Sequence, residues 1–207
     1  PMETIRNVCG ALLNNQHVGL PGLLFIDTPG HHSFSTLRSR GGALADIAIL
    51  IVDIIEGLMP QTIESINILK RTRTPFIIAG NKVDRINGWV RTPGEPFRQS
   101  LAKQDSAVAQ ILDDKLYALI GQIAEKGFNT DRYDRIKDFT KNVAIVPVCA
   151  RDGTGLGDLL MVLVGLAQRF LEQQLLSGLG PGRGTVLEVK EVRGLGLTLD
   201  LILYDGE

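Results

Sequence analysis

The chain of 207 residues lacks the pattern G-x-x-x-x-G-K-[ST], whose backbone N–H groups cradle phosphates in many nucleotide-binding proteins. It is also poor in cysteine, with only Cys9 and Cys149. These two lie far apart and match no metal-ligand or redox spacing, so we expect two reduced thiols and no disulfide.

Charge and long apolar runs are equally sparse. The formal net charge is -1 and the pI is about 6.4, so bulk charge does not favour a nucleic-acid backbone as a ligand. Apolar runs such as residues 47–52 fall far short of the roughly 18 residues that a membrane span needs, and no signal-peptide pattern opens the chain. We therefore expect a cytoplasmic protein without a membrane partner. The first residue is Pro1 rather than Met, which favours a fragment.

The chain alternates between two kinds of apolar pattern. Short runs rich in branched residues predict buried strands at residues 23–26, 47–52, 76–79 and 143–148. Helical periodicity predicts helices at residues 2–15, 33–43, 62–71 and 159–171. This alternation is typical of an α/β fold, a mostly parallel sheet with helices on both faces.

Two stretches depart from this alternation. A helical stripe over residues 99–126, with another short helix suggested by Tyr133, Ile136 and Phe139, predicts a helical insertion. Residues 177–184 are rich in turn formers and predict a linker, which divides the chain into domains at 1–176 and 185–207. Leucines occupy every second position from Leu197 to Leu203, which is typical of a strand with one apolar face. We therefore predict that the second domain is the opening hairpin of a β-barrel.

Three short polar motifs each follow a predicted strand. They are Asp27-Thr28-Pro29-Gly30-His31, Asn81-Lys82-Val83-Asp84 and Cys149-Ala150-Arg151. The carboxyl ends of parallel strands meet at one edge of a sheet, where open α/β folds bind their ligands. The three motifs therefore predict one binding site, and their chemistry indicates a guanine nucleotide.

The first motif fits the phosphate end of such a ligand. Asp27 can hold Mg²⁺, mainly through its water shell, because this ion prefers oxygen ligands and keeps several waters. Gly30 lets its backbone N–H approach a terminal phosphate, and His31 can orient an attacking water, which makes it the candidate catalytic residue. By itself the pattern D-x-x-G also suits an ordinary turn after a strand.

The second and third motifs fit the base. A carboxylate at Asp84 can accept hydrogen bonds from N1 and N2 of guanine, a donor pair that adenine lacks. Asn81 can link neighbouring loops, and the stem of Lys82 can cover the base face. Backbone N–H groups around Ala150 can bind guanine O6, with the Arg151 stem beside the base.

These motifs resemble those of the translational GTPases, and within them the initiation factor 5B family. The resemblance extends over nearly the whole chain and includes Asp27-Thr28-Pro29-Gly30-His31-His32, Leu37-Arg38-Ser39-Arg40-Gly41, Val52-Asp53, Pro60-Gln61-Thr62 and Asn81-Lys82-Val83-Asp84. The insertion after Asp84, with Asn87-Gly88-Trp89, is similar to the archaeal and eukaryotic branch. Cys149 stands where that family more often has Ser.

The resemblance implies a phosphate-loop GTPase domain whose phosphate loop and first switch are not in this sequence. It implies GTP or GDP and Mg²⁺ as ligands, His31 as catalytic residue, and hydrolysis stimulated by the ribosome, with ribosomal RNA near the second switch. It further implies joining of ribosomal subunits with initiator tRNA, which is bound through domains absent here, and contact with other initiation factors. The fragment alone is expected to be inactive.

Two alternatives remain open. The chain can belong to another elongation-type factor, which the domains after the linker would decide. It can also be a nucleotide-dead binding module that keeps the fold as a scaffold, which the upstream sequence would decide.

Overall fold

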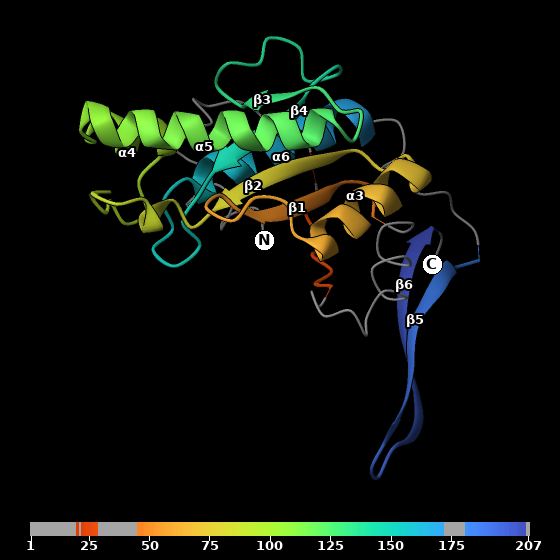
Figure 1. Ribbon diagram of the computed structural model, residues 1–207. Helices are drawn as coiled ribbons and strands as arrows, with labels where there is room; N and C mark the ends of the chain where they lie inside the picture. Colours follow the sequence, from red (N-terminus) through yellow and green to blue (C-terminus); the bar gives the residue numbers. More distant parts are fainter. Residues whose placement is uncertain (1–19, 21, 29–44, 172–180, 206–207) are drawn as a thin grey trace.

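The computed structural model describes residues 20, 22–28, 45–171 and 181–205 (Figure 1). The helices predicted at residues 2–15 and 33–43 lie outside these residues, as does the first half of the predicted linker, residues 177–180.

The centre of the molecule is a four-stranded parallel sheet. Its strands are β1 (Ala48–Asp53), β2 (Phe76–Asn81), β3 (Thr130–Arg132) and β4 (Val143–Pro147), in the spatial order β1-β2-β4-β3. The register pairs Asp53 with Asn81 and Gly80 with Pro147. β1, β2 and β4 therefore end at the same edge. Two of the three predicted motif-bearing strands, those before Asn81 and Cys149, are confirmed there as β2 and β4.

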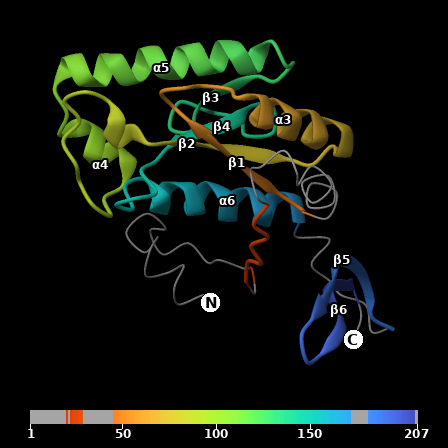
Figure 2. The ribbon, with the colours of Figure 1, turned by 60° about the horizontal axis from the view of Figure 1, so that its bottom comes forward.

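Helices cover both faces of this sheet. They are α3 (Pro60–Thr72), α4 (Phe97–Ala102), α5 (Ser106–Ala124) and α6 (Leu156–Leu171). Figure 2 shows α3 and α5 on one face and α6 on the other. The α/β class and the helical insertion are thus confirmed. Among the described residues, no helix combines the length and apolar character needed to cross a membrane.

The core lies where these layers meet. Ile77, Ile78 and Ile145 of the central strands are fully buried. The inward stripe of α5 is buried as well, at Val108, Leu112, Leu116, Leu119 and Ile123. Burial of one stripe every three to four residues explains why the insertion forms a helix against the sheet.

The strand predicted at residues 23–26 is wrong. Residues 22–28 have no regular secondary structure, and Leu24 and Phe25 are 75% and 62% exposed. A strand needs a neighbour to satisfy its N–H and C=O groups, and no strand of the described sheet pairs with this segment. The outer edge of β1 is open within the described residues, where Ile51 is 65% exposed.

The short helix predicted around Tyr133, Ile136 and Phe139 is also wrong. The N–H of Tyr133 donates to Ile145 O at 2.9 Å, which extends the pairing of β3 with β4. Arg135 N–H then donates to Arg132 O at 2.8 Å and closes a turn. Residues 133–135 form this turn, and Ile136 and Phe139 pack against the core from turn and irregular backbone.

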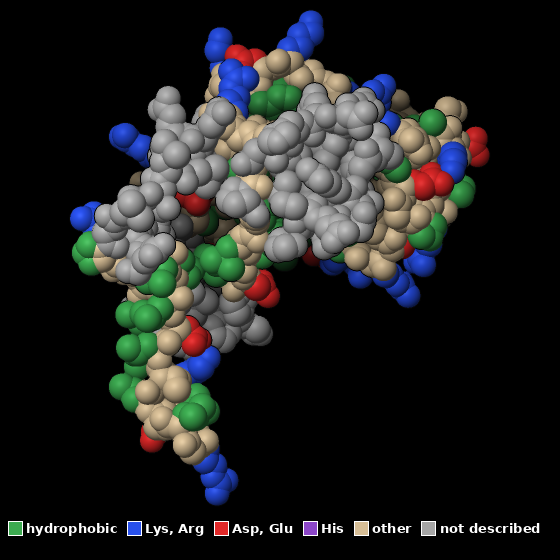
Figure 3. All heavy atoms as spheres, turned by 180° about the vertical axis from the view of Figure 1, so that it is seen from behind, with side chains coloured by type: hydrophobic (Ala, Val, Ile, Leu, Met, Phe, Trp, Pro, Cys, Tyr) green, Lys and Arg blue, Asp and Glu red, His purple; other side chains and the backbone are tan. Residues whose placement is uncertain are grey.

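The predicted hairpin is confirmed as β5 (Arg183–Val192) and β6 (Gly196–Asp205), paired antiparallel. β5 begins at Arg183, two residues before the expected start. Figure 3 shows hydrophobic side chains along this hairpin. The period-two leucines of β6 are exposed, namely Leu197, Leu199, Leu201 and Leu203. The assignment of this hairpin to a β-barrel domain stays a prediction.

Candidate guanine-nucleotide site

The loops after β2 and β4 lie side by side at the carboxyl edge of the sheet. Val148 N–H donates to Gly80 O at 2.8 Å, and Val83 N–H donates to Val148 O at 3.3 Å. The pairing of the two strands therefore continues into their loops, and it brings the second predicted motif against the third.

Asn81 joins these loops directly. Its Oδ1 atom accepts hydrogen bonds from Ala150 N–H at 3.0 Å and from Lys82 N–H at 2.8 Å. An amide oxygen has two lone pairs, so both bonds can form at once. The predicted linking role of Asn81 therefore has a geometric basis.

Lys82 adopts a left-handed backbone conformation, with φ 69° and ψ 36°. This conformation is costly for a residue with a Cβ. The Nζ atom lies 2.7 Å from Asp53 Oδ2, at the end of β1. Burial raises the pKa of Asp53, but the Lys82 ammonium and the N–H of Ile55 outweigh it and lower the pKa below its ordinary value. The ion pair thus ties Lys82 to the neighbouring strand.

Asp84 lies in the one-turn 3-10 helix η2 (Val83–Arg85), and its side chain is only 9% exposed. The guanidinium of Arg91 approaches its Oδ2 atom at 3.3 Å. A carboxylate offers about four lone-pair positions, so Asp84 can bind Arg91 and still accept hydrogen bonds from a base. Arg91 therefore holds the Asp84 carboxylate, the predicted acceptor for guanine, in place and leaves lone-pair positions free for a base.

Cys149, the first residue of the third motif, is buried. Burial is the main cause that raises the pKa of its thiol to about 11. The nearby carboxylates of Asp152 and Asp84 raise it further, while the backbone N–H groups of Asp152 and Arg151 oppose the rise. The thiol is therefore neutral at pH 7, as a serine hydroxyl would be.

The third motif lies in a loop, residues 149–155, that closes on itself. Cys149 N–H donates to Thr154 O at 2.9 Å, and Asp152 Oδ1 accepts the N–H of Thr154 at 3.0 Å. The single hydroxyl hydrogen of Thr154 is shared between Asp152 Oδ1 at 2.7 Å and Thr92 O at 2.8 Å. Burial raises the pKa of Asp152, but the Thr154 donors outweigh it and the pKa is lowered. The loop is therefore pre-organised.

Ala150 and Arg151 are exposed at the tip of this loop. The N–H of Ala150, predicted to bind guanine O6, already donates to Asn81. An O6 atom would have to share that donor with Asn81, and the backbone N–H of Arg151 is the neighbouring donor. The structure thus brings together Asn81, Lys82, Val83, Asp84, Cys149, Ala150 and Arg151, while their binding roles stay predictions.

The first motif is only partly described. Asp27 is exposed, and Thr28 is half-buried. Pro29, Gly30 and His31 lie outside the described residues. Among the residues that are described, no group of three or more His, Cys, Asp or Glu could hold a metal ion. A lone exposed Asp27 fits Mg²⁺ held chiefly by water and phosphates, since this ion often takes one or two carboxylates from the protein.

Sequence reasoning missed the supporting residues Asp53 and Arg91. Asp53 was visible as a carboxylate directly after a predicted strand, the same signal that singled out Asp27. Arg91 carried no such signal, because its position beside Asp84 depends on the path of the loop through Trp89.

Comparison with known proteins agrees with this geometry. Residues 18–169 match the family described as "Elongation factor Tu GTP binding domain". The chain is 57% identical over 208 residues to the "Probable translation initiation factor IF-2" of Methanocella arvoryzae, and 59% identical over 207 residues to that of Methanothrix thermoacetophila. All of this chain is covered, but only 35% and 34% of those proteins.

A solved structure is similar throughout the chain. It is described as "Crystal structure of GDP-bound aIF5B from Aeropyrum pernix", with 48% identity and a TM-score of 0.91, and the match covers 100% of this chain and 35% of that one. The chain thus spans about a third of the length of the relatives that it matches. It belongs to the elongation factor Tu GTP binding domain family, and over its whole length it is similar to the archaeal IF-2 and aIF5B proteins.

Proposed function

We propose that this chain carries the guanine-recognising part of a GTPase that promotes joining of ribosomal subunits with initiator tRNA in place. The observation that carries the proposal is the link from Asn81 Oδ1 to Ala150 N–H, which sets the loop of Asp84 against the loop of Arg151. The two curated relatives described above are probable translation initiation factors, which supports the same role.

Base recognition follows from the donors and acceptors at this edge. Asp84 accepts the N1 and N2 hydrogens of guanine, whereas adenine would leave that carboxylate unsatisfied. The stem of Lys82 covers one face of the base, and the backbone N–H groups at residues 150 and 151 serve O6. The site thereby prefers GTP to ATP.

Hydrolysis falls to the first motif. Gly30 N–H binds the terminal phosphate and His31 orients the water that attacks it, while ribosomal RNA sets His31 in place. Mg²⁺, held by Asp27 through water, supplies charge neutralisation of the phosphates when it is bound. Loss of the terminal phosphate frees the segment of residues 27–31, and the factor leaves the ribosome. The protein acts in the cytoplasm, with the ribosome and other initiation factors as partners.

The test uses the full-length protein. We expect fluorescent GDP to bind in the presence of excess ATP, and GTP turnover to rise when ribosomes are added. His31→Ala should abolish the ribosome-stimulated turnover while GDP binding persists. GDP binding that ATP displaces, or turnover indifferent to ribosomes, would contradict the proposal.

A further inference from the structure

The segment between Trp89 and α4 lies against the loop of residues 149–155. We call it the clamp segment, residues 92–97. Three hydrogen bonds join the two: Gly94 N–H to Asp152 O at 2.9 Å, Gly155 N–H to Glu95 O at 2.9 Å, and Thr154 Oγ1 to Thr92 O at 2.8 Å. A Cβ built on Gly153 would lie 3.5 Å from Gly94 Cα, so any side chain at Gly153 would contact the backbone of Gly94.

The side chains in this contact are buried. Thr92, Thr154 and Ser100 are all shielded from solvent. Thr92 Oγ1 donates to Ser100 Oγ at 2.5 Å, which attaches the clamp segment to α4. Buried hydrogen bonds are costly to leave unmade, because water cannot replace the lost partner. The contact is therefore fixed rather than a loose surface approach.

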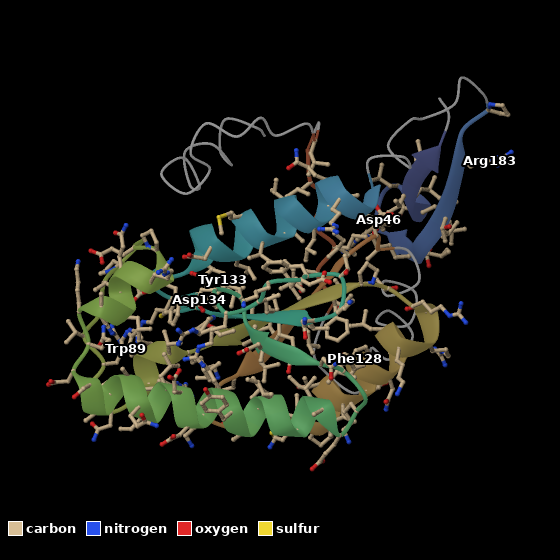
Figure 4. The ribbon with its side chains drawn as sticks, turned by 90° about the horizontal axis from the view of Figure 1, so that it is seen from above. Asp46, Trp89, Phe128, Tyr133, Asp134 and Arg183 are labelled. Atoms are coloured by element: carbon tan, nitrogen blue, oxygen red, sulfur yellow. The ribbon has the colours of Figure 1, made fainter. Side chains whose placement is uncertain are left out.

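The far end of the clamp segment is attached to the opposite helix layer. Asp158, buried in the first turn of α6, accepts Phe97 N–H at 2.8 Å on Oδ2 and the Tyr133 O–H at 2.5 Å on Oδ1. Figure 4 shows Tyr133 between α5 and α6. The clamp segment thus connects the loop of residues 149–155 to the packed interior.

We propose that the clamp segment positions the loop of residues 149–155 for guanine and so sets how long a bound nucleotide stays. This inference rests on the proposed function, because it concerns the same base site. Asn81 holds the tip of the loop at Ala150, and the clamp segment holds its other limb at Asp152, Thr154 and Gly155. The direction of the backbone N–H groups at residues 150 and 151 depends on both attachments.

The main test is Gly94→Ala in the full-length protein. Gly94 has φ +72°, a conformation strained for any residue with a Cβ, although no atom lies within 4 Å of where that Cβ would be. The strain should shift the turn that donates to Asp152. We expect the GDP dissociation rate constant to rise about fivefold. Inosine diphosphate lacks the 2-amino group of GDP but keeps O6. The Gly94→Ala change should weaken its binding by the same factor as that of GDP, because the loop of residues 149–155 contacts O6 and not N2.

Gly127→Ala is the matched control. Gly127 has φ +88°, and its Cβ would meet only the flexible end of Lys70, at 3.2 Å. The neighbouring Phe128 packs on Phe76 at the amino end of β2, opposite the base site, and Figure 4 shows Phe128 far from Trp89 along α5. We expect a similar loss of melting temperature with an unchanged GDP dissociation rate.

A second pair tests the buried bond itself. Thr154→Val removes the hydroxyl hydrogen that Thr92 O and Asp152 Oδ1 share but keeps the side-chain shape, whereas Thr154→Ser keeps that hydrogen. The valine variant should release GDP about fivefold faster, and the serine variant should restore most of the wild-type lifetime.

The outcomes are distinct. The proposed role of the clamp segment is overturned by one result. In that result, Gly94→Ala and Thr154→Val fold and lose melting temperature as Gly127→Ala does, but they release GDP at the wild-type rate. Failure of the wild-type protein to bind GDP in excess ATP would overturn the proposed function, and the role of the clamp with it.

Discussion

Asn81 Oδ1 accepts the backbone N–H of Ala150 at 3.0 Å, although the two residues lie 69 positions apart in the chain. The same oxygen accepts Lys82 N–H at 2.8 Å. One side-chain atom thus fixes the two loops that follow β2 and β4, and the base site depends on it.

Asn81→Ala should therefore separate the loops. It leaves two backbone N–H groups without their acceptor, so we expect a loss of about 1–2 kcal/mol in the free energy of unfolding. GDP affinity in the full-length protein should fall by about tenfold or more. Asn81→Asp keeps the acceptor oxygen and serves as the control in urea unfolding. If the aspartate variant were destabilised as much as the alanine variant, the two hydrogen bonds would not be the cause.

Asp84→Asn should change which base is bound. The asparagine offers one donor and one acceptor, which mismatches the two donors of guanine but complements xanthine, where a carbonyl replaces the 2-amino group. We expect GDP affinity to fall about 100-fold and xanthosine diphosphate to become the better ligand. Competition between the two diphosphates against a fluorescent analogue measures this. Equal weakening for both would mean that Asp84 does not read the base edge.

The sequence predicted the elements that depend on local pattern. The inward stripe of α5 follows from the spacing of Leu112, Leu116 and Leu119, and the buried β2 follows from its apolar run. Each of these elements follows from the spacing of apolar residues within one continuous stretch of chain, so one sequence is enough to predict it.

Features that depend on distant partners were missed. β3 is only Thr130–Arg132, with no apolar alternation, and it exists because β4 offers it an edge. Residues 23–26 have a strand-like composition, but no strand in the described part of the chain pairs with them. The clamp segment was invisible because two of its three bonds to the loop join backbone groups, which any sequence supplies.

The Cys149 thiol should make stability depend on alkaline pH. Its folded pKa of about 11 lies above its ordinary value of 9.0, so the folded state keeps a proton that the unfolded state has lost. The contribution of the protonated Cys149 thiol to the free energy of unfolding is fully present below pH about 9 and declines as pH rises toward about 11. Urea unfolding at several pH values checks this, with Cys149→Ser as the variant that lacks this decline. Native Cys149 should also resist alkylation at pH 8 in a Cys9→Ser background.

Tyr133→Phe should destabilise the fold through Asp158. The change removes the donor to Asp158 Oδ1 in a buried site, and we expect the free energy of unfolding to fall by about 1–3 kcal/mol. Tyr117→Phe is the matched control, because Tyr117 is 58% exposed and contacts Arg135 at the surface. It should change stability by less than about 0.5 kcal/mol. Similar losses in both variants would argue against the buried bond.

Because Lys82 has a left-handed backbone conformation, we expect the glycine variant at this position to be more stable than the alanine variant, the reverse of the usual order. Lys82→Gly and Lys82→Ala both lose the ion pair with Asp53, but only alanine keeps the cost of a Cβ at φ 69°. We expect the glycine variant to be more stable to urea by about 1 kcal/mol. Both should bind GDP more weakly than wild type, because both lose the stem that covers the base.

Lys103 gives the control for that ranking. It also pairs with an acidic residue, Glu95, but its backbone is right-handed, with φ -93° and ψ -5°. There alanine should be more stable than glycine by about 0.5–1 kcal/mol, because glycine loses more conformational freedom on folding. The same order at both sites would mean that Lys82 is not strained. If glycine is the more stable variant at residue 82 and alanine the more stable at residue 103, Lys82 is strained. A strained lysine is then present where glycine would be more stable, because glycine has no stem to cover a base.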